Sequence, residues 1–154
     1  MAINQDKLHE FLGKAIVDFG ATFNAALIRI GDKPGLYPGK DYDFATFFDC
    51  LHDMGDPAGA SAHAHSTLKK DGTWTIVEPA AGDKLEGNLN PIGRAFYGAS
   101  TLICTPASLS QKVGLALGAQ AGEKRLREVV TSGGFSHFRR ATQTPFNLIF
   151  EARP

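Results

Sequence analysis

The chain has 154 residues, of which 43% are hydrophobic and 21% are charged. This length allows one domain with a substantial core and is too short for two domains that each have a core of their own. Because 16 Lys and Arg residues balance 16 Asp and Glu residues, no net positive field draws the chain to nucleic acid or to an acidic membrane.

The two cysteines, Cys50 and Cys104, both lie in apolar stretches. This usage is typical of free thiols in a reducing compartment rather than of a disulfide framework. No run reaches the roughly 18 apolar residues of a membrane span, and the N-terminus lacks the apolar run of a signal peptide. We therefore expect a cytoplasmic protein without nucleic-acid or membrane partners.

Two helices are predicted at the N-terminus. Apolar residues recur at helical spacing from Asn4 to Gly20, and Ala21 to Ile30 is apolar enough for a second, mostly buried helix. Glycines and prolines then crowd residues 31–43, which is typical of a linker. The sequence predicts an N-terminal helical segment at residues 1–37 and a main domain at 38–154.

The main domain begins with a predicted strand-helix-strand unit. Phe44 to Phe48 is a short apolar run, Ala58 to Leu68 is helical, Asp71-Gly72 forms a turn, and Thr73 to Val77 is β-branched or aromatic. Strands buried on both faces and joined by a helix indicate a parallel βαβ unit.

Further along, Pro91 to Leu102 and Gly122 to Thr131 are predicted helices, the second closed by Gly133-Gly134. Phe135 to Arg140 and Phe146 to Ala152 are predicted strands of a terminal hairpin. The order of elements predicts an α/β fold.

Polar groups follow both strands of the βαβ unit, where ligands bind in open α/β sheets. Asp49, His52 and Asp53 follow the first strand, and Glu78 ends the second. In one interpretation His52 is a general base and Asp49 accepts a cationic or hydroxyl-bearing ligand. In the other, Asp49 and Asp56 cap helices and His52 is a surface loop residue.

The other polar patterns in the sequence give weaker indications of a functional site. His63 and His65 could form a metal cluster with His52 and Asp53, but the two side chains diverge by about 200° on a helix and cannot share one ion, so we predict no metal site. Nothing near Cys50 activates it as a nucleophile, which favours a buried structural thiol. Along a predicted strand, the basic residues around Phe138 indicate a solvated sheet face (His137, Arg139, Arg140). No GxGxxG, Walker A or GxSxG pattern occurs.

Several segments resemble, in order, the carboxyl-terminal half of bacterial class I S-adenosylmethionine (SAM)-dependent methyltransferases that carry an N-terminal winged-helix domain. They are DFATFFDCLHDMGDPAGA, STLKKDGTWTIVEP, EGNLNPIGRAFYGASTLICTPASLSQ, REVVTSGGF and TPFNLIFEARP. The opening segments DKLHEFLGKAIVDFGA and IGDKPGLY resemble the first helices of the winged-helix part, so the resemblance covers almost the whole chain.

The resemblance implies a partial Rossmann-like sheet. The family's strand order is 3-2-1-4-5-7-6, and this chain matches strands 4-5-7-6, with an antiparallel last pair, flanking helices and an N-terminal helical appendage. Strands 1 to 3 have no matching segment, and with them the glycine-rich cofactor loop is missing. Residues 44–48 would then form an open apolar edge that favours self-association.

The resemblance also implies site roles. Asp49, Cys50 and Leu51 would flank the methionine end of the SAM cofactor, and His52 and Asp53 would form the catalytic rim of the acceptor pocket. The predicted substrate-binding residues are Glu78, Arg94, Tyr97, Ser100 and Thr101.

These features lead to two hypotheses of function. The first is SAM-dependent methyl transfer to an unknown small molecule, impaired by the missing loop. The second is a noncatalytic remnant that acts at most as a binding or dimerisation module, pairing through the N-terminal helices or the edge strand 44–48. A DNA-binding role has less support, because residues 4–36 lack a complete helix-turn-helix and a basic face.

Overall fold

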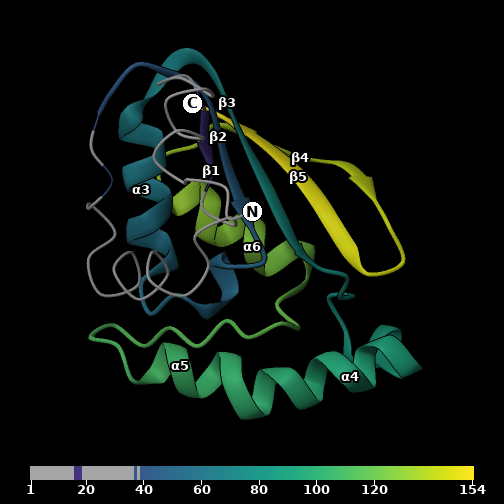
Figure 1. The fold of residues 1–154 in the computed structure, drawn as a ribbon. Coiled ribbons are helices and arrows are strands. Elements are labelled where there is room, and N and C mark those ends of the chain that lie inside the picture. The colour runs from purple at the N-terminus through teal and green to yellow at the C-terminus, as the bar shows by residue number, and fades with distance from the viewer. Residues whose placement is uncertain (1–15, 19–36, 38) are drawn as a thin grey trace, which may run out of the picture.

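A computed structural model describes residues 16–18, 37 and 39–154 of the chain (Figure 1). Its strands form one five-stranded sheet in the order β1-β2-β3-β5-β4. Their bounds are β1 Ile16–Asp18, β2 Tyr42–Phe48, β3 Leu68–Pro79, β4 His137–Gln143 and β5 Asn147–Arg153.

The sheet combines parallel and antiparallel pairs. β1, β2 and β3 run parallel to one another, whereas β5 runs antiparallel to both β3 and β4. β5 is the last strand of the chain and lies between β3 and β4. The strands β2-β3-β5-β4 therefore confirm the predicted order 4-5-7-6 with its antiparallel last pair.

β1 is a strand where the sequence predicts a helix and an N-terminal appendage. Ile16–Asp18 pairs in parallel with Phe44 to Thr46 of β2, so the helix prediction over Asn4 to Gly20 is wrong at these residues. Ile16 and Val17 are β-branched, and an exposed strand edge gains hydrogen bonds from a partner. The predicted open edge at 44–48 is thus wrong for Phe44 to Thr46. The rest of that helix, and the one predicted at Ala21 to Ile30, lie outside the described residues.

The βαβ unit is confirmed. Helix α3 (Pro57–Thr67) joins the parallel strands β2 and β3, and Asp56 caps it by accepting a hydrogen bond from the Gly59 amide at 2.8 Å. The turn predicted at Asp71-Gly72 is wrong, because β3 begins at Leu68 and includes both residues. A register shift opposite Tyr42 and Phe44 accommodates these extra residues of β3.

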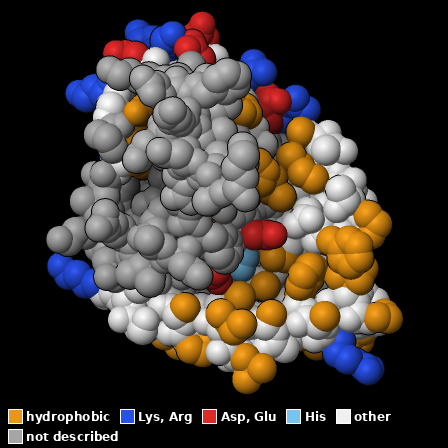
Figure 2. All heavy atoms as spheres, viewed as in Figure 1, with side chains coloured by type: hydrophobic (Ala, Val, Ile, Leu, Met, Phe, Trp, Pro, Cys, Tyr) orange, Lys and Arg blue, Asp and Glu red, His pale blue; other side chains and the backbone are white. Residues whose placement is uncertain are grey.

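A long helical stretch lies along the lower side of the molecule in Figure 1. It continues from α4 (Pro91–Ala99) through a π-helical turn, η3 (Ser100–Cys104), into α5 (Thr105–Leu109). The helix predicted to end at Leu102 thus reaches Leu109. Hydrophobic side chains gather on this side in Figure 2. Leu102 of η3 is 79% exposed.

Helix α6 (Gly122–Ser132) confirms the last predicted helix and contacts α3. Two short 3₁₀ turns, η1 (Leu51–Asp53) and η2 (Leu85–Asn88), follow β2 and β3.

The core is centred on Trp74, which is fully buried. Its ring lies 4.7 Å from that of Phe47 and 5.1 Å from that of Phe135, measured between centroids. The Trp74 Nε1 atom has no hydrogen-bond partner among the residues that the structure describes. Within those residues, no helix is long and apolar enough to cross a membrane.

Candidate functional site

The candidate site begins where β2 ends. Asp49 has a φ of 46° and donates its amide to the Val77 carbonyl at 2.8 Å, so the chain turns sharply beside β3. The η1 turn follows and directs His52 inward, where the residue is only 5% exposed. The alternative that His52 is a surface loop residue is therefore wrong.

Glu78, at the end of β3, holds this loop. Its Oε1 accepts a hydrogen bond from the Leu51 amide at 2.9 Å, and its Oε2 lies 2.5 Å from Nδ1 of His52. The Glu78 residue is 1% exposed. Both oxygens are thus engaged inside the protein, which differs from the substrate-facing position that the sequence predicts for Glu78.

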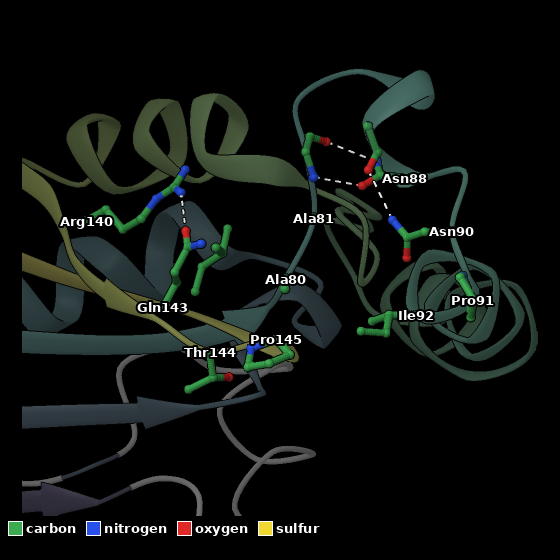
Figure 3. Close-up of a pocket in the computed structure, with 13 residues that line it drawn as sticks. Ala80, Ala81, Asn88, Asn90, Pro91, Ile92, Arg140, Gln143, Thr144 and Pro145 are labelled. Atoms are coloured by element: carbon green, nitrogen blue, oxygen red, sulfur yellow. Dashed lines mark hydrogen bonds between the residues drawn. The ribbon is translucent and has the colours of Figure 1, made fainter.

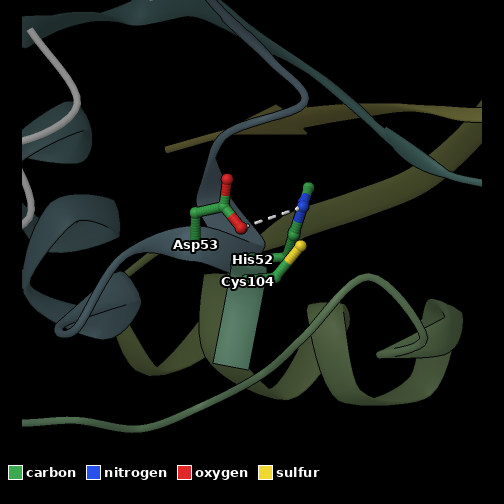
Figure 4. A group of neighbouring side chains, drawn as sticks. All are labelled: His52, Asp53 and Cys104. Atoms are coloured by element: carbon green, nitrogen blue, oxygen red, sulfur yellow. Dashed lines mark ion pairs between the residues drawn. The ribbon is translucent and has the colours of Figure 1, made fainter. Parts of the chain in front are cut away.

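Two further groups, Asp53 and Cys104, lie beside the imidazole (Figure 4). Asp53 Oδ1 lies 3.2 Å from His52 Nε2, yet it has no partner in hydrogen-bond geometry within the described part of the chain. The Cys104 thiol comes from the π-helical turn η3, and one ligand atom from each of His52, Asp53 and Cys104 lies within 4.8 Å of the others. The sequence analysis missed Cys104, which is 52 positions from His52 along the chain.

The electrostatic balance of the site favours positive charge on the imidazole. Burial lowers the pKa of His52, but the Glu78 carboxylate, contact with Cys104 and the Asp53 carboxylate outweigh it and raise the pKa to about 11. Burial, then the negative charge of Glu78, raises the pKa of Asp49. The same two causes hold the pKa of the Cys50 thiol well above its usual value.

The residues predicted to flank the cofactor divide into two kinds. The side chains of Cys50 and Leu51 are fully buried, and Cys50 is a free thiol. Asp49 is half-buried, and its Oδ1 accepts a long hydrogen bond from Asn147 Nδ2 at 3.4 Å. Of these three residues, only Asp49 has a carboxylate, and among the described residues it caps no helix.

The other predicted acceptor residues, Arg94, Tyr97, Ser100 and Thr101, lie on the long helical stretch. Arg94 and Tyr97 line a hollow of about 500 Å³ together with residues 88–91. Ser100 accepts a hydrogen bond from the Ala119 amide at 3.1 Å, and Thr101 donates one to the Tyr97 carbonyl at 2.8 Å. Within the described residues, no hydrogen bond joins any of the four to His52 or Asp53.

A larger hollow of about 640 Å³ opens between the loop after β3 and the turn of the β4–β5 hairpin (Figure 3). Asn88 and Asn90 line one side of it, and Arg140 and Gln143 line the other. Asn88 is held by hydrogen bonds to both backbone groups of Gly82. No sequence pattern predicted this hollow, because the residues that line it come from two segments that are far apart along the chain.

His63, His65 and the basic residues of β4 each have their own neighbours. His63 hydrogen-bonds the Tyr37 carbonyl, whereas the ring of His65 packs edge-on against Phe135, so the two histidines point to different neighbours. On β4, Phe138 is buried while Arg139 and Arg140 are exposed and form ion pairs with Glu151 and Glu123. The solvated sheet face is confirmed.

Comparisons with known proteins show which solved structures have a similar fold. No protein-family model and no curated protein matches the chain. Human N-acetylserotonin methyltransferase in complex with SAM is similar over 79% of this chain and 32% of its own, with 17% identity and a TM-score of 0.57. An O-methyltransferase family protein from Burkholderia thailandensis is similar over 80% and 33%, with 18% identity and a TM-score of 0.54.

A third similar structure is PigF with SAH, which covers 83% of this chain and 33% of its own at 15% identity and a TM-score of 0.55. The chain spans about a third of the length of these structures. The sheet order and these likenesses together show that the described chain has the fold of class I SAM-dependent methyltransferases, as a partial core.

Proposed function

We propose that the chain is a SAM-dependent methyltransferase core that transfers a methyl group to a small-molecule acceptor with impaired efficiency. The observation that carries this proposal is the buried pair of His52 and Glu78 at the carboxyl ends of β2 and β3. In open α/β sheets this edge is where ligands bind.

The position of β1 supports the proposal. β1 lies beside β2 and parallel to it, which is the position of strand 1 in the family order 3-2-1-4-5-7-6. In that family the glycine-rich cofactor loop follows strand 1. The residues after Asp18 lie outside the described part of the chain, so the missing glycine-rich loop stays a prediction.

The described residues fit the methionine end of such a cofactor. The half-buried Asp49 carboxylate stands at the carboxyl edge of the sheet and can accept hydrogen bonds from an ammonium group. SAM, when bound, supplies a methyl group on a positively charged sulfur that is already reactive. The protein then mainly has to align the acceptor and remove its proton.

His52 would take that proton at Nε2. Glu78 engages Nδ1 and so fixes the tautomer and the orientation of the ring, as the carboxylate does in other histidine-carboxylate pairs. The acceptor oxygen or nitrogen would lose its proton to Nε2 as it forms a bond to the methyl carbon, while the bond from that carbon to the sulfur breaks and S-adenosylhomocysteine (SAH) leaves. Because the resting site favours a proton on His52, that proton must leave first, which is a second reason to expect slow transfer.

Two measurements test the proposal. Calorimetric titration with SAM should give saturable one-to-one heat, and transfer of a labelled methyl group to a panel of phenols and amines should be slow and fall further in His52→Ala. Absence of heat at millimolar cofactor would contradict the proposal. Equal transfer by His52→Ala would contradict the role of His52.

A noncatalytic binding module is the second candidate, favoured by the burial of His52 and by the apolar side chains exposed on the long helical stretch. Tight cofactor binding would speak against it. The winged-helix resemblance and homodimer formation through the N-terminal residues concern residues outside the described part of the chain, and they stay predictions. The cytoplasmic location stays a prediction as well.

A further inference from the structure

We infer that His52, Asp53 and Cys104 form a binding site for a divalent transition metal of the zinc type. The three side chains bring one nitrogen, one oxygen and one sulfur atom within 4.8 Å of one another. His52 Nε2 and Asp53 Oδ1 are 3.2 Å apart, a spacing that suits two ligands bound about 2 Å from a common zinc ion.

The neighbouring carboxylate is arranged as in known zinc sites. Glu78 Oε2 lies 2.5 Å from His52 Nδ1, which leaves Nε2 beside Asp53 Oδ1. Histidines that bind metals almost always donate their other ring N–H to a carboxylate, a carbonyl or water, and this partner orients the ring and raises its basicity. Glu78 already performs this task.

Asp53 supplies an independent observation. Its Oδ1 is buried and points into the cluster, yet it lacks a hydrogen-bond partner within the described residues. A positively charged His52 compensates for this buried oxygen as an ion pair at 3.2 Å, and a metal ion held by the same atoms would compensate for it through direct bonds. A cation bound between Asp53, His52 and Cys104 would satisfy it.

The backbone brings the thiol to the cluster in an unusual way. Cys104 ends the π-helical turn Ser100–Cys104, which interrupts the stretch between α4 and α5. π-Helical turns are rare in proteins, and many of those that exist lie at functional sites. Cys104 is 6% exposed and is a free thiol, so nothing competes for its sulfur through a disulfide.

The chemical types of the three ligand atoms indicate which metal the site would bind. Mixed nitrogen, sulfur and oxygen ligands suit zinc, whereas magnesium and calcium prefer oxygen alone. Binding would release the thiol proton of Cys104 and any proton on His52 Nε2 to solvent, since only the thiolate and the unprotonated nitrogen coordinate. Three protein ligands would leave a fourth position for water or a ligand group.

The inference does not depend on the proposed methyl transfer. A metal on Nε2 would occupy the nitrogen that is proposed to take the acceptor's proton, so the metal-loaded chain would be inactive in that reaction. Its test therefore measures the metal directly.

The experiment uses the full chain, stripped with a chelator and titrated with Co²⁺ as a spectroscopic substitute for Zn²⁺. We expect one ion per chain, an absorption spectrum of low-symmetry tetrahedral cobalt with a thiolate charge-transfer band, and displacement by Zn²⁺. Cys104→Ser should abolish the charge-transfer band, and Glu78→Gln should weaken binding by about 10- to 100-fold. His65→Gln is the matched control and should change neither.

Three outcomes would overturn the inference. They are absence of a charge-transfer band in the native chain, a band that disappears in Cys50→Ser rather than in Cys104→Ser, and binding that is lost in His65→Gln. The first outcome is read on the unaltered protein, so a variant that fails to fold does not affect it.

Discussion

Glu78 is a fully buried carboxylate whose two oxygens bind the Leu51 amide and the His52 ring. A charge of this kind is tolerated in the interior only because these partners compensate for the lost water. Since the partners belong to the loop after β2 and Glu78 belongs to β3, a single side chain joins the ends of two strands. The conformation of η1 therefore depends on Glu78.

Replacing Glu78 with Ala should lower the free energy of unfolding by about 3–5 kcal/mol, because it leaves His52 buried without its counter-charge. Urea unfolding followed by circular dichroism measures the change. Glu128→Ala is the control, since the exposed pair of Glu128 with Arg125 should contribute less than about 1 kcal/mol. Equal losses in the two variants would show that the His52–Glu78 contact stabilises nothing.

His63 should make the fold sensitive to acid. Burial lowers its pKa, while its hydrogen bond to the Tyr37 carbonyl opposes this shift. Burial also raises the pKa of the Tyr37 phenol, whose ring contacts His63, to about 12, so that group stays neutral. As pH falls, the unfolded chain takes up the proton of His63 first, near its ordinary pKa of about 6.5. Stability contributed by His63 is therefore present above that pH and lost below it.

In His63→Gln the loss of stability between about pH 7.5 and about pH 5.5 should be smaller than in the native chain. Chemical unfolding at the two pH values measures the difference. Identical losses in both proteins would contradict the assignment to His63.

At the scale of elements, Gly133, which follows the last residue of α6, lies against helix α3. A Cβ atom added there would lie 2.5 Å from the Ser61 Cβ and 2.7 Å from the Ala62 amide nitrogen. These distances are too short for any side chain, and two of the contacting atoms belong to the backbone of α3. The close contact of the two helices thus requires glycine.

Gly133→Ala should destabilise the fold by about 1–3 kcal/mol through overpacking. The matched control is Gly98→Ala on α4, where an added Cβ meets nothing within 4 Å. That change should stabilise the helix by about 0.5–1 kcal/mol, because alanine loses less backbone entropy than glycine. Thermal unfolding of both variants should give shifts of opposite sign, and two shifts of the same sign would contradict this account.

The elements also show which features a sequence can predict. Runs such as Thr73 to Val77 and the caps around α3 carry their own local signals, so the βαβ unit, α6 and the hairpin were predictable. β1 was not, because Ile16 fits the helical spacing of apolar residues from Asn4 to Gly20, and the segment is a strand only through pairing with β2. The π-helical turn at Ser100–Cys104 likewise has no local signal, so the contact of Cys104 with His52 could not be foreseen.

At the scale of the whole molecule, β1 is the element that covers the edge of the sheet. It is three residues long and pairs with Phe44 to Thr46. Uncovered strand edges are templates for pairing with another chain. The sequence predicted that this edge favours self-association. In the structure, a segment more than twenty residues upstream covers part of the edge.

Introducing Ile16→Pro and Val17→Pro together should uncover the edge. Residues in a strand point their N–H groups alternately to the two sides, so one of the two prolines removes a donor to β2. We expect concentration-dependent association in light scattering. The control replaces both residues with Thr, which favours strands. A double proline variant with the native size distribution would contradict the role of β1.

The burial of Trp74 gives the protein an internal optical reporter. It is the only tryptophan in the chain, it is fully buried between two aromatic rings, and its indole N–H contacts no acceptor among the described residues. Its fluorescence should therefore be shifted to short wavelength and should resist quenching by iodide. Because Trp74 touches β2 through Phe47 and the end of α6 through Phe135, its emission follows the docking of that helix onto the sheet without any attached dye.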